Sequence, residues 1–287
     1  MPVELTIRDG DPWWLSPDIW VVPGNNPEGE PGAPMAGQDC FIWARVSNEG
    51  RSSVQNATVR FYWANPAAGF DRDTAVLVGT ANVNLDGGET TEVLCLTPWR
   101  PTLVNNGHSC VLAEVFHADL DPLPATVDFN VVTDRHVAQR NLTVVSATAG
   151  MFMAYAEFHN RERHARRFVL RLVEGEIGAL KPLAKTIGRP LPKELGQFRG
   201  MAFARERCPN LEDTLKKGED QLEVEIPAHS SVALTVVAHF DGPAALVHVE
   251  QAERDPRRPA CKTHHGKAVP LGGLSILAIN TEKKVAR

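Results

Sequence analysis

The sequence contains no pair of cysteines spaced as CxxC, and its five cysteines are an odd number for a chain of 287 residues. This argues against a disulfide framework and leaves at most isolated bridges. The cysteines are Cys40, Cys95, Cys110, Cys208 and Cys261. We expect most of them to be small buried hydrophobic residues.

Long apolar runs and an excess of basic residues are also missing. No window approaches the roughly 18 consecutive apolar residues that span a bilayer. The first twenty residues lack the basic start and apolar stretch of a secretory signal. The net charge of −5 gives no reason to expect a nucleic-acid partner. We therefore expect no membrane span, no nucleic-acid partner and a cytoplasmic location, with export by another route left open.

Motifs that carry catalysis are absent too. The sequence has no phosphate-binding loop, no dinucleotide fingerprint and no GxSxG nucleophile motif. We expect no cofactor and no enzymatic activity.

The second half of the chain has no tryptophan, because all six lie within the first hundred residues. Phenylalanine, leucine and valine take their place in the second half. This shift indicates two separately built cores, in agreement with a prior of roughly 150 residues per domain. We place the domains at 1–140 and 141–287.

What the chain does contain is a series of short alternating segments. In residues 39–47, Cys40, Ile42, Ala44 and Val46 fall on one face, and a turn follows at Asn-Glu-Gly. Similar spacing elsewhere, without helical periodicity, favours an antiparallel sandwich in each half. The expected strands are 39–47, 57–64, 75–84, 89–96 and 109–117, followed by 141–147, 151–159, 167–173, 222–227, 230–240, 244–251 and 272–280.

Three further segments break this pattern. We expect an insertion at 174–218 to form one or two short helices, interrupted by Pro182, and to cover an edge or end of the second sandwich. The irregular stretches Pro23–Pro34 and Arg254–Pro270 are long loops, which are more often functional than structural. We rank these two loops as the first candidates for contact with a partner.

Four sequence segments of the first half form a recognisable series: ARVSNEG at Ala44–Gly50, ATVRFYW at Ala57–Trp63, LDGGE at Leu85–Glu89 and PWRP at Pro98–Pro101. In these segments the first half resembles bacterial immunoglobulin-like domains of the CARDB (cell-adhesion-related) type. The resemblance implies adhesion or ligand presentation, usually outside the cell, and supplies no catalytic residue. We predict an all-β protein of two tandem immunoglobulin-like β-sandwich domains, the second divergent and carrying the short helical insertion.

The resemblance also places two cysteines. Cys40 and Cys110 fall on the second and sixth strands, where immunoglobulin domains often join their sheets. A bridge there is one alternative; two buried thiols in a reducing compartment are the favoured one.

Two groups of polar residues are candidates for special chemistry. Cys261, His264 and His265 lie in the 254–270 loop and have side chains that bind zinc. They lack the four ligands and the paired short spacings of a structural site, so a polar surface loop is the favoured interpretation. Asp134 and His136 are conceivable as an acid–base pair, but no nucleophile motif accompanies them.

Arginines provide the remaining candidates. Arg135 and Arg140, in the same segment as Asp134 and His136, offer planar donor groups that would lock the two domains through hydrogen bonds to backbone. A basic run in a hairpin turn contains Arg163, Arg166 and Arg167. Such a run is usually solvated, but it also suits an acidic partner.

Taken together, these features favour a non-catalytic protein-interaction or assembly subunit that acts through its sandwich loops. One alternative is a metal-binding protein or metal-dependent hydrolase that uses the 261–265 loop. Another is a self-assembling structural protein, a homo-oligomer, because exposed sandwich edges can add strands across subunits.

Overall fold

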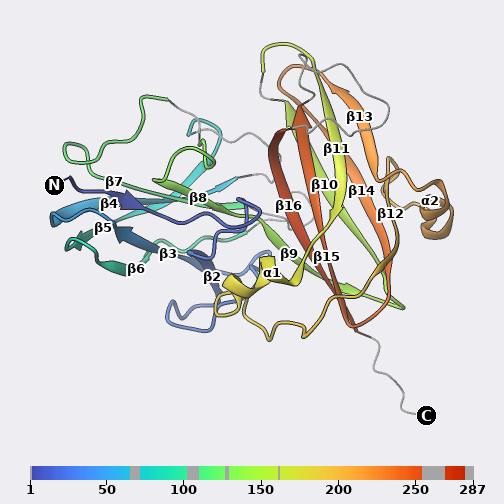
Figure 1. Ribbon diagram of the computed structural model, residues 1–287, viewed down its shortest axis with the longest axis horizontal. Helices are drawn as coiled ribbons and strands as arrows, with labels where there is room; N and C mark the ends of the chain where they lie inside the picture. The colour runs from blue at the N-terminus through green and yellow to red at the C-terminus, as the bar shows by residue number, and fades with distance from the viewer. Residues whose placement is uncertain are drawn as a thin grey trace. The chain divides into compact units, whose positions relative to one another are not determined.

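The computed structural model describes residues 2–64, 72–101, 110–126, 129–160, 162–253 and 269–281, and these are almost wholly strands and connecting loops (Figure 1). They divide into two compact units. The first unit contains the described residues up to Asn141 together with Gly178–Leu191. The second contains Leu142–Ile177 and the described residues from Pro192 onwards.

The first unit is a sandwich of two antiparallel sheets. In one sheet the central strand β3 (Cys40–Asn48) pairs with β1 (Leu5–Thr6), β2 (Ile19–Pro23) and β6 (Thr90–Leu94). The other has the order β5 (Val76–Leu85), β4 (Val54–Ala64), β7 (Cys110–Phe116), β8 (Val137–Arg140). This division of strands between the sheets is that of an immunoglobulin-type sandwich.

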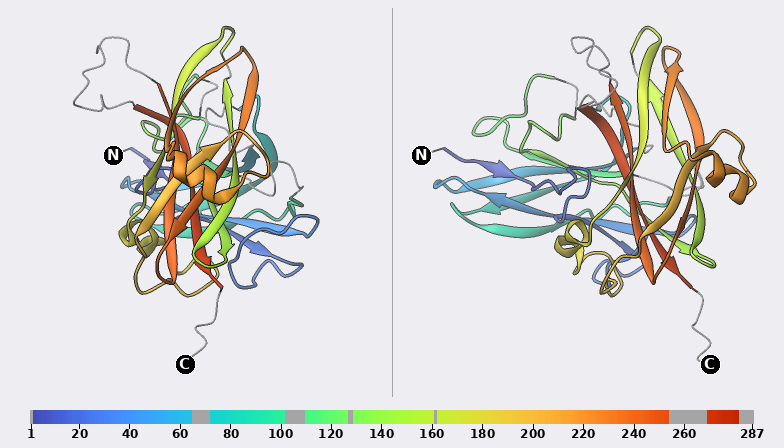
Figure 2. Two further views of the ribbon diagram at one scale, coloured as in Figure 1. Left: turned by 90° about the vertical axis from the view of Figure 1, so that its right-hand side faces the viewer. Right: turned by 45° about the vertical axis from the view of Figure 1, so that its right-hand side comes forward.

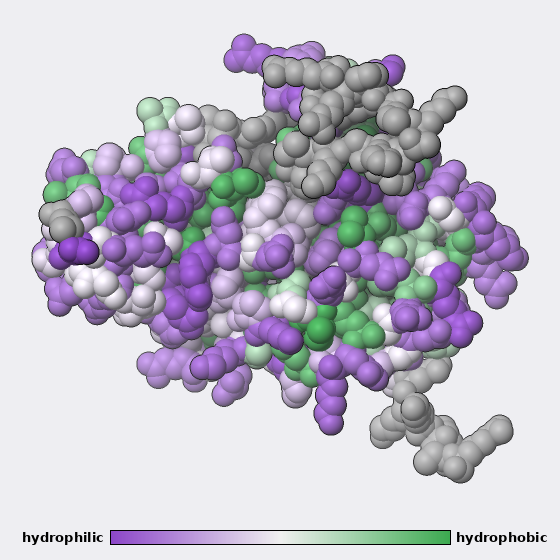
Figure 3. Space-filling model, in the orientation of Figure 1, coloured by the Kyte–Doolittle hydropathy of each residue, from purple (hydrophilic) through white to green (hydrophobic). Residues whose placement is uncertain are grey.

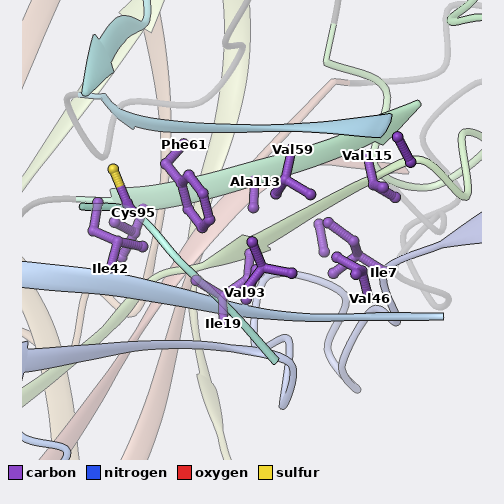
Figure 4. Packing of buried hydrophobic residues seen from close by; sticks show 14 of the residues in the cluster. Ile7, Ile19, Ile42, Val46, Val59, Phe61, Val93, Cys95, Ala113 and Val115 are labelled. Carbon is purple, nitrogen blue, oxygen red and sulfur yellow. The ribbon is translucent and has the colours of Figure 1, made fainter. Parts of the chain in front are cut away.

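The core of the first unit forms where the two sheets face each other. Every second residue of β3, from Cys40 to Asn48, is buried, which confirms the face predicted from the sequence. Ile42 and Val46 of β3 point toward Val59 and Phe61 of β4 (Figure 4). The alternation in sequence therefore reflects one face packed on the core and one turned away from it.

The opposite face of the β4–β7 sheet is covered as well. Cys110 and Leu112 of β7 pack there with Tyr62, Phe129 and Val131 in a second, smaller apolar cluster. Strand β7 is consequently buried on both faces over most of its length. The segment between β7 and β8 therefore folds back over the sheet instead of leaving that face to water.

The second unit is also a sandwich (Figure 2). One sheet has the order β10 (Met151–Asn160), β14 (Ser230–Phe240), β12 (Phe198–Ala204). The other has the order β13 (Gln221–Ile226), β11 (Arg166–Glu174), β15 (Ala244–Glu253), β16 (Val269–Asn280), β9 (Leu142–Ala147), in which only the β16–β9 pair is parallel. Phenylalanines and aliphatic residues of both sheets form its core. The protein is thus all-β with two sandwich units, as predicted.

The insertion at 174–218 differs in part from the prediction. The short helices expected around Pro182 are present as α1 (Ile177–Leu180) and a 3-10 turn at Lys181–Leu183, whereas α2 (Leu211–Lys217) lies outside the stretch in which helices are expected. The insertion also contains β12, which covers one edge of the second unit beside β14. Gly178–Leu191, however, packs with the first unit, because Leu180, Leu183 and Ile187 are buried there.

None of the short helices in the described residues has the length and apolar character needed to cross a bilayer. On the face shown in Figure 3, hydrophilic residues cover much of the described surface, with hydrophobic residues between them.

Candidate functional site

Asp134 and His136 do lie together, in a buried cluster of the first unit. His136 Nδ1 is 2.7 Å from Asp134 Oδ1, and its Nε2 is 3.2 Å from Asp121 Oδ1. Asp121 also accepts hydrogen bonds from Arg135 at 2.6 Å and from the backbone N–H of Leu5 at 2.7 Å. The imidazole therefore lies between two carboxylates, with a hydrogen bond to Asp134 through Nδ1, whereas Nε2 makes no hydrogen bond within the described residues.

This cluster stabilises the fold and is too buried to contact a substrate. The exposed fractions of Asp121, Asp134 and His136 are only 7%, 8% and 4%. Their partners tie the segment after β7 to strand β1. The cluster thus fixes the segment that covers the outer face of the β4–β7 sheet.

Arg140, another residue singled out in the sequence, is buried at the end of β8. Its guanidinium donates to the carbonyl of Ile19 at 2.8 Å and to the hydroxyl and carbonyl of Thr186 at 2.6 and 3.1 Å. These partners are neutral, and burial lowers the pKa of Arg140 to about 10. All of them belong to the first unit, so a lock between the two units stays a prediction. What Arg140 does hold in place is Gly178–Leu191.

The basic run begins after β10 and ends in the first two residues of β11, so Arg166 and Arg167 lie in a strand. The expected hairpin turn is wrong, because β10 and β11 belong to different sheets and the connection crosses between them. Arg166 pairs with Glu162 at 2.9 Å and with Glu253, and Arg167 pairs with Glu225 at 3.0 Å. Arg163 is exposed. Much of the positive charge is therefore matched by neighbouring carboxylates, which weakens its attraction for an acidic partner.

The metal candidates Cys261, His264 and His265 lie outside the described residues, as does most of the 254–270 loop. Within the described ranges, no group of three or more His, Cys, Asp or Glu side chains is placed to hold a metal ion. Cys40 and Cys110 are both buried and both free, so the structure shows two thiols instead of a bridge.

A concave site of the first unit, with a volume of about 410 Å³, lies beside the β2–β3 pair. We call it the tryptophan pocket. Its residues come from β2, β3, β6, the loop after β2 and the Gly178–Leu191 segment: Trp20, Val22, Pro27, Glu28, Gly29, Pro31, Trp43, Arg45, Glu92, Lys185 and Thr186.

Two tryptophans form its aromatic surface. Trp20 and Trp43 are direct cross-strand partners on β2 and β3. Their rings are 5.9 Å apart between centroids and only 6° from parallel. Trp20 is buried and Trp43 is half-buried, so Trp43 is the ring that meets the solvent. The indole N–H of Trp43 donates to the carbonyl of Pro27 at 2.9 Å, which fixes the orientation of the ring.

Charged side chains surround this aromatic surface. Arg45 lies over the ring of Trp20, 5.6 Å from its centroid. It is held there by Asp18 at 3.1 Å and by Glu92 at 2.8 Å. Asp18 is buried and also accepts two hydrogen bonds from Arg8. Arg45 is therefore a preorganised part of the pocket wall.

The remaining wall is made by two loops that meet closely. Gly188 has a φ of +72°, and a Cβ at that position would lie 2.0 Å from the carbonyl oxygen of Pro31. Only glycine permits this approach. Arg140 anchors Thr186 nearby. The 178–191 segment and the Pro23–Pro34 loop thus close the pocket together.

The sequence predicts one part of this site and misses the rest. The Pro23–Pro34 loop, expected as a contact region, does line the pocket. Trp20, Trp43 and Arg45 are not among the residues that the sequence singles out. Their signal is present, because the two tryptophans flank the Pro- and Gly-rich loop. The contribution of Lys185 and Thr186 has no local signal, since it depends on where the insertion packs.

The chain matches no protein-family model and no curated protein. Among solved structures, it is similar to the CARDB domain of a Pyrococcus furiosus protein in complex with di-metal ions. The identity is 17%, the match covers 48% of this chain and 89% of that one, and the TM-score is 0.28. It is also similar to the collagen adhesin of S. aureus, at 8% identity over 92% of each chain with a TM-score of 0.24.

A third similar structure is the red sea bream transglutaminase. There the identity is 10%, the match covers 93% of this chain and 32% of that one, and the TM-score is 0.24. Likenesses at this level carry no weight for function.

Proposed function

We propose that the protein is a non-catalytic interaction protein that recognises its partner through the tryptophan pocket. The observation that carries this proposal is the contrast between two polar groups of the first unit. The ionisable cluster around His136 is buried and bonded to segments of its own unit, whereas Trp43 and its surrounding charges line a preorganised hollow. An aromatic surface ringed by a few polar groups is typical of a binding site.

Rigidity supports the same proposal. The orientation of Trp43 is fixed by Pro27, that of Arg45 by Asp18 and Glu92, and the far wall by Arg140. Groups that are already ordered lose little conformational entropy when a ligand binds. A surface held in this way, and not itself engaged in packing, is suited to recognition.

The test is a comparison of partner capture by three forms of the full chain. Wild type, Trp43→Ala and Trp63→Ala are immobilised, and retained material is compared by quantitative mass spectrometry. Trp63 is a matched control, because it is also half-buried in the first unit but stacks on Trp99 outside the pocket. We expect a partner held by wild type and Trp63→Ala and released by Trp43→Ala. A partner held equally by all three forms contradicts the proposal, and so does capture of nothing by wild type.

Self-assembly is a second candidate, favoured by the open side of the same sandwich. Strands β5 and β6 each pair with only one neighbour among the described strands, and a hollow of about 520 Å³ lies along them. Leu77 and Leu96 expose 51% and 79% of their surface there. Edge strands with exposed apolar residues readily pair with another chain. Light scattering across a hundredfold concentration range decides this, with Leu96→Lys expected to abolish any dimer.

A further inference from the structure

We propose that the tryptophan pocket binds an uncharged sugar ring, so that the partner is a glycan or a glycan-bearing surface. This inference rests on the proposed function and names its ligand class. Three features of the pocket point to it: the flat face that it offers, the balance of its charges and its size.

The pocket has an aromatic surface, but the indole N–H of Trp43 is not free to donate a hydrogen bond to a ligand. Trp43 lines the pocket and is half-buried, while its N–H, the only donor of an indole, is already bonded to the carbonyl of Pro27. A pyranose ring has a face of C–H groups that packs flat against an indole and needs no donor from it. An extended peptide, by contrast, carries carbonyl groups that seek N–H donors. The geometry of Trp43 therefore favours the sugar.

The charges around the ring cancel. Arg45 and Lys185 are positive, and Glu28 and Glu92 are negative. The buried Asp18 also pairs with Arg45, and its charge is matched by that of Arg8. A ligand with net charge would meet attraction and repulsion in similar measure. Sugar hydroxyls both donate and accept hydrogen bonds, so they can use carboxylates and cations at the same time.

The volume of the hollow also suits a sugar ring. Its volume of about 410 Å³ lies within the roughly 300–1,000 Å³ of small-molecule sites. Glu28 and Lys185 are exposed at its rim. A sugar at the end of a chain, or one unit within a longer chain, can therefore enter while the rest of the glycan stays in solvent.

The experiment is a screen of purified full-length protein against immobilised neutral and sialylated glycans, followed by calorimetry with the strongest neutral oligosaccharide. We expect binding of neutral glycans, weakened about tenfold or more by Trp43→Ala, because the exposed indole supplies an appreciable part of a weak affinity for a sugar. Trp63→Ala should bind as wild type does. The double variant Glu28→Gln and Lys185→Met changes only exposed rim residues, so it keeps the fold and should also weaken binding.

Each other outcome overturns the inference. Failure of every neutral glycan at millimolar concentration does so, as does binding that survives Trp43→Ala, or a response confined to sialylated glycans. To separate this inference from the proposed function, captured partners are treated with glycosidases before the capture is repeated. Capture that depends on Trp43 but survives glycosidase leaves the interaction role intact and rejects the sugar. Capture that is independent of Trp43 rejects both.

Discussion

The two units differ in how many charged residues they bury. The buried acidic and basic side chains of the first unit are Asp18, Glu114, Asp121, Asp134, His136 and Arg140, whereas His248 is the only such residue among the described part of the second unit. The ion pairs of the second unit include exposed ones, such as Arg167–Glu225 and Arg199–Asp241, and partly buried ones, such as Arg171–Glu250. Buried charges need satisfied partners, and in the first unit several of those partners, such as Arg72, Arg135 and Thr186, belong to loops.

This difference explains why the first unit has a shaped binding surface. Asp121 and His136 hold the segment after β7, and Arg140 holds the 178–191 segment, both at specific places. Strand faces alone give a flat sheet surface. Loops fastened over such a face by buried polar bonds create hollows with fixed walls, and the tryptophan pocket is one of them.

The largest expected changes in the free energy of unfolding come from truncating a phenylalanine in either of the two apolar cores. Phe61 of the first unit and Phe240 of the second are almost fully buried. Truncation of either to alanine should cost about 3–5 kcal/mol of the free energy of unfolding of its own unit. All six tryptophans belong to the first unit. Tryptophan fluorescence during urea unfolding therefore reports on that unit, and far-ultraviolet circular dichroism reports on both.

Phe61→Ala should shift the fluorescence transition to lower urea, and Phe240→Ala should shift only the circular dichroism. An equal shift of fluorescence by both variants would show that the two cores unfold as one, against the independence predicted from the tryptophan distribution.

The next prediction compares a buried carboxylate with an exposed one. Glu114 is fully buried and accepts hydrogen bonds from Tyr62 at 2.7 Å and Arg72 at 2.8 Å. Glu114→Gln removes the buried carboxylate that pairs with Arg72 and should cost about 3 kcal/mol. Glu225→Gln removes the partner of Arg167, whose side chain is 78% exposed, and should cost about 0–1 kcal/mol. Urea unfolding of both variants measures the difference, and equal costs would refute the contrast between the units.

How far the sequence predicts this fold depends on whether a strand has one buried face or two. Strand β3 alternates between buried and partly exposed residues, and that pattern predicts it. Strand β2 is buried at four consecutive positions and β8 at all four, so neither alternates and the pattern misses both. It also misses strand β12, whose register shifts at Phe198 and Gly200.

The candidate site, too, is only partly predictable from local sequence. Local sequence identifies a loop by its Pro, Gly and Asn content, and this content identifies the Pro23–Pro34 loop. It does not say which long-range segment covers the loop. Contact between Gly188 and Pro31 depends on the packing of the insertion, which no periodicity within 174–218 specifies.

A side chain introduced at Gly188 is expected to disrupt the pocket wall at that contact. Gly188 and Gly218 both have left-handed backbone, with φ of +72° and +64°. Alanine should cost about 1–2 kcal/mol at either position through this conformation alone. At Gly218 the nearest atom to a new Cβ is 3.9 Å away, whereas at Gly188 it is 2.0 Å. Gly188→Ala should therefore destabilise the first unit further and reduce ligand capture, and Gly218→Ala should leave capture unchanged. Equal capture by both variants would mean that the 178–191 wall is not needed.

The smallest effect concerns the thiols. Burial raises the pKa of Cys40, Cys95 and Cys110 in the first unit, and most strongly that of Cys110, which keeps them protonated and inaccessible. Cys208 in the second unit is exposed. In a Cys261→Ser background, we expect a thiol reagent to modify one cysteine of the native protein and four after denaturation.

Peptide mapping should assign the modified native residue to Cys208, and Cys208→Ser should change the free energy of unfolding by no more than about 0.5 kcal/mol. Rapid modification of Cys110 in the native protein would mean that the segment after β7 opens readily. The buried bonds of Asp121 and His136 would then not fasten it, and the contrast between the two units would lose its basis.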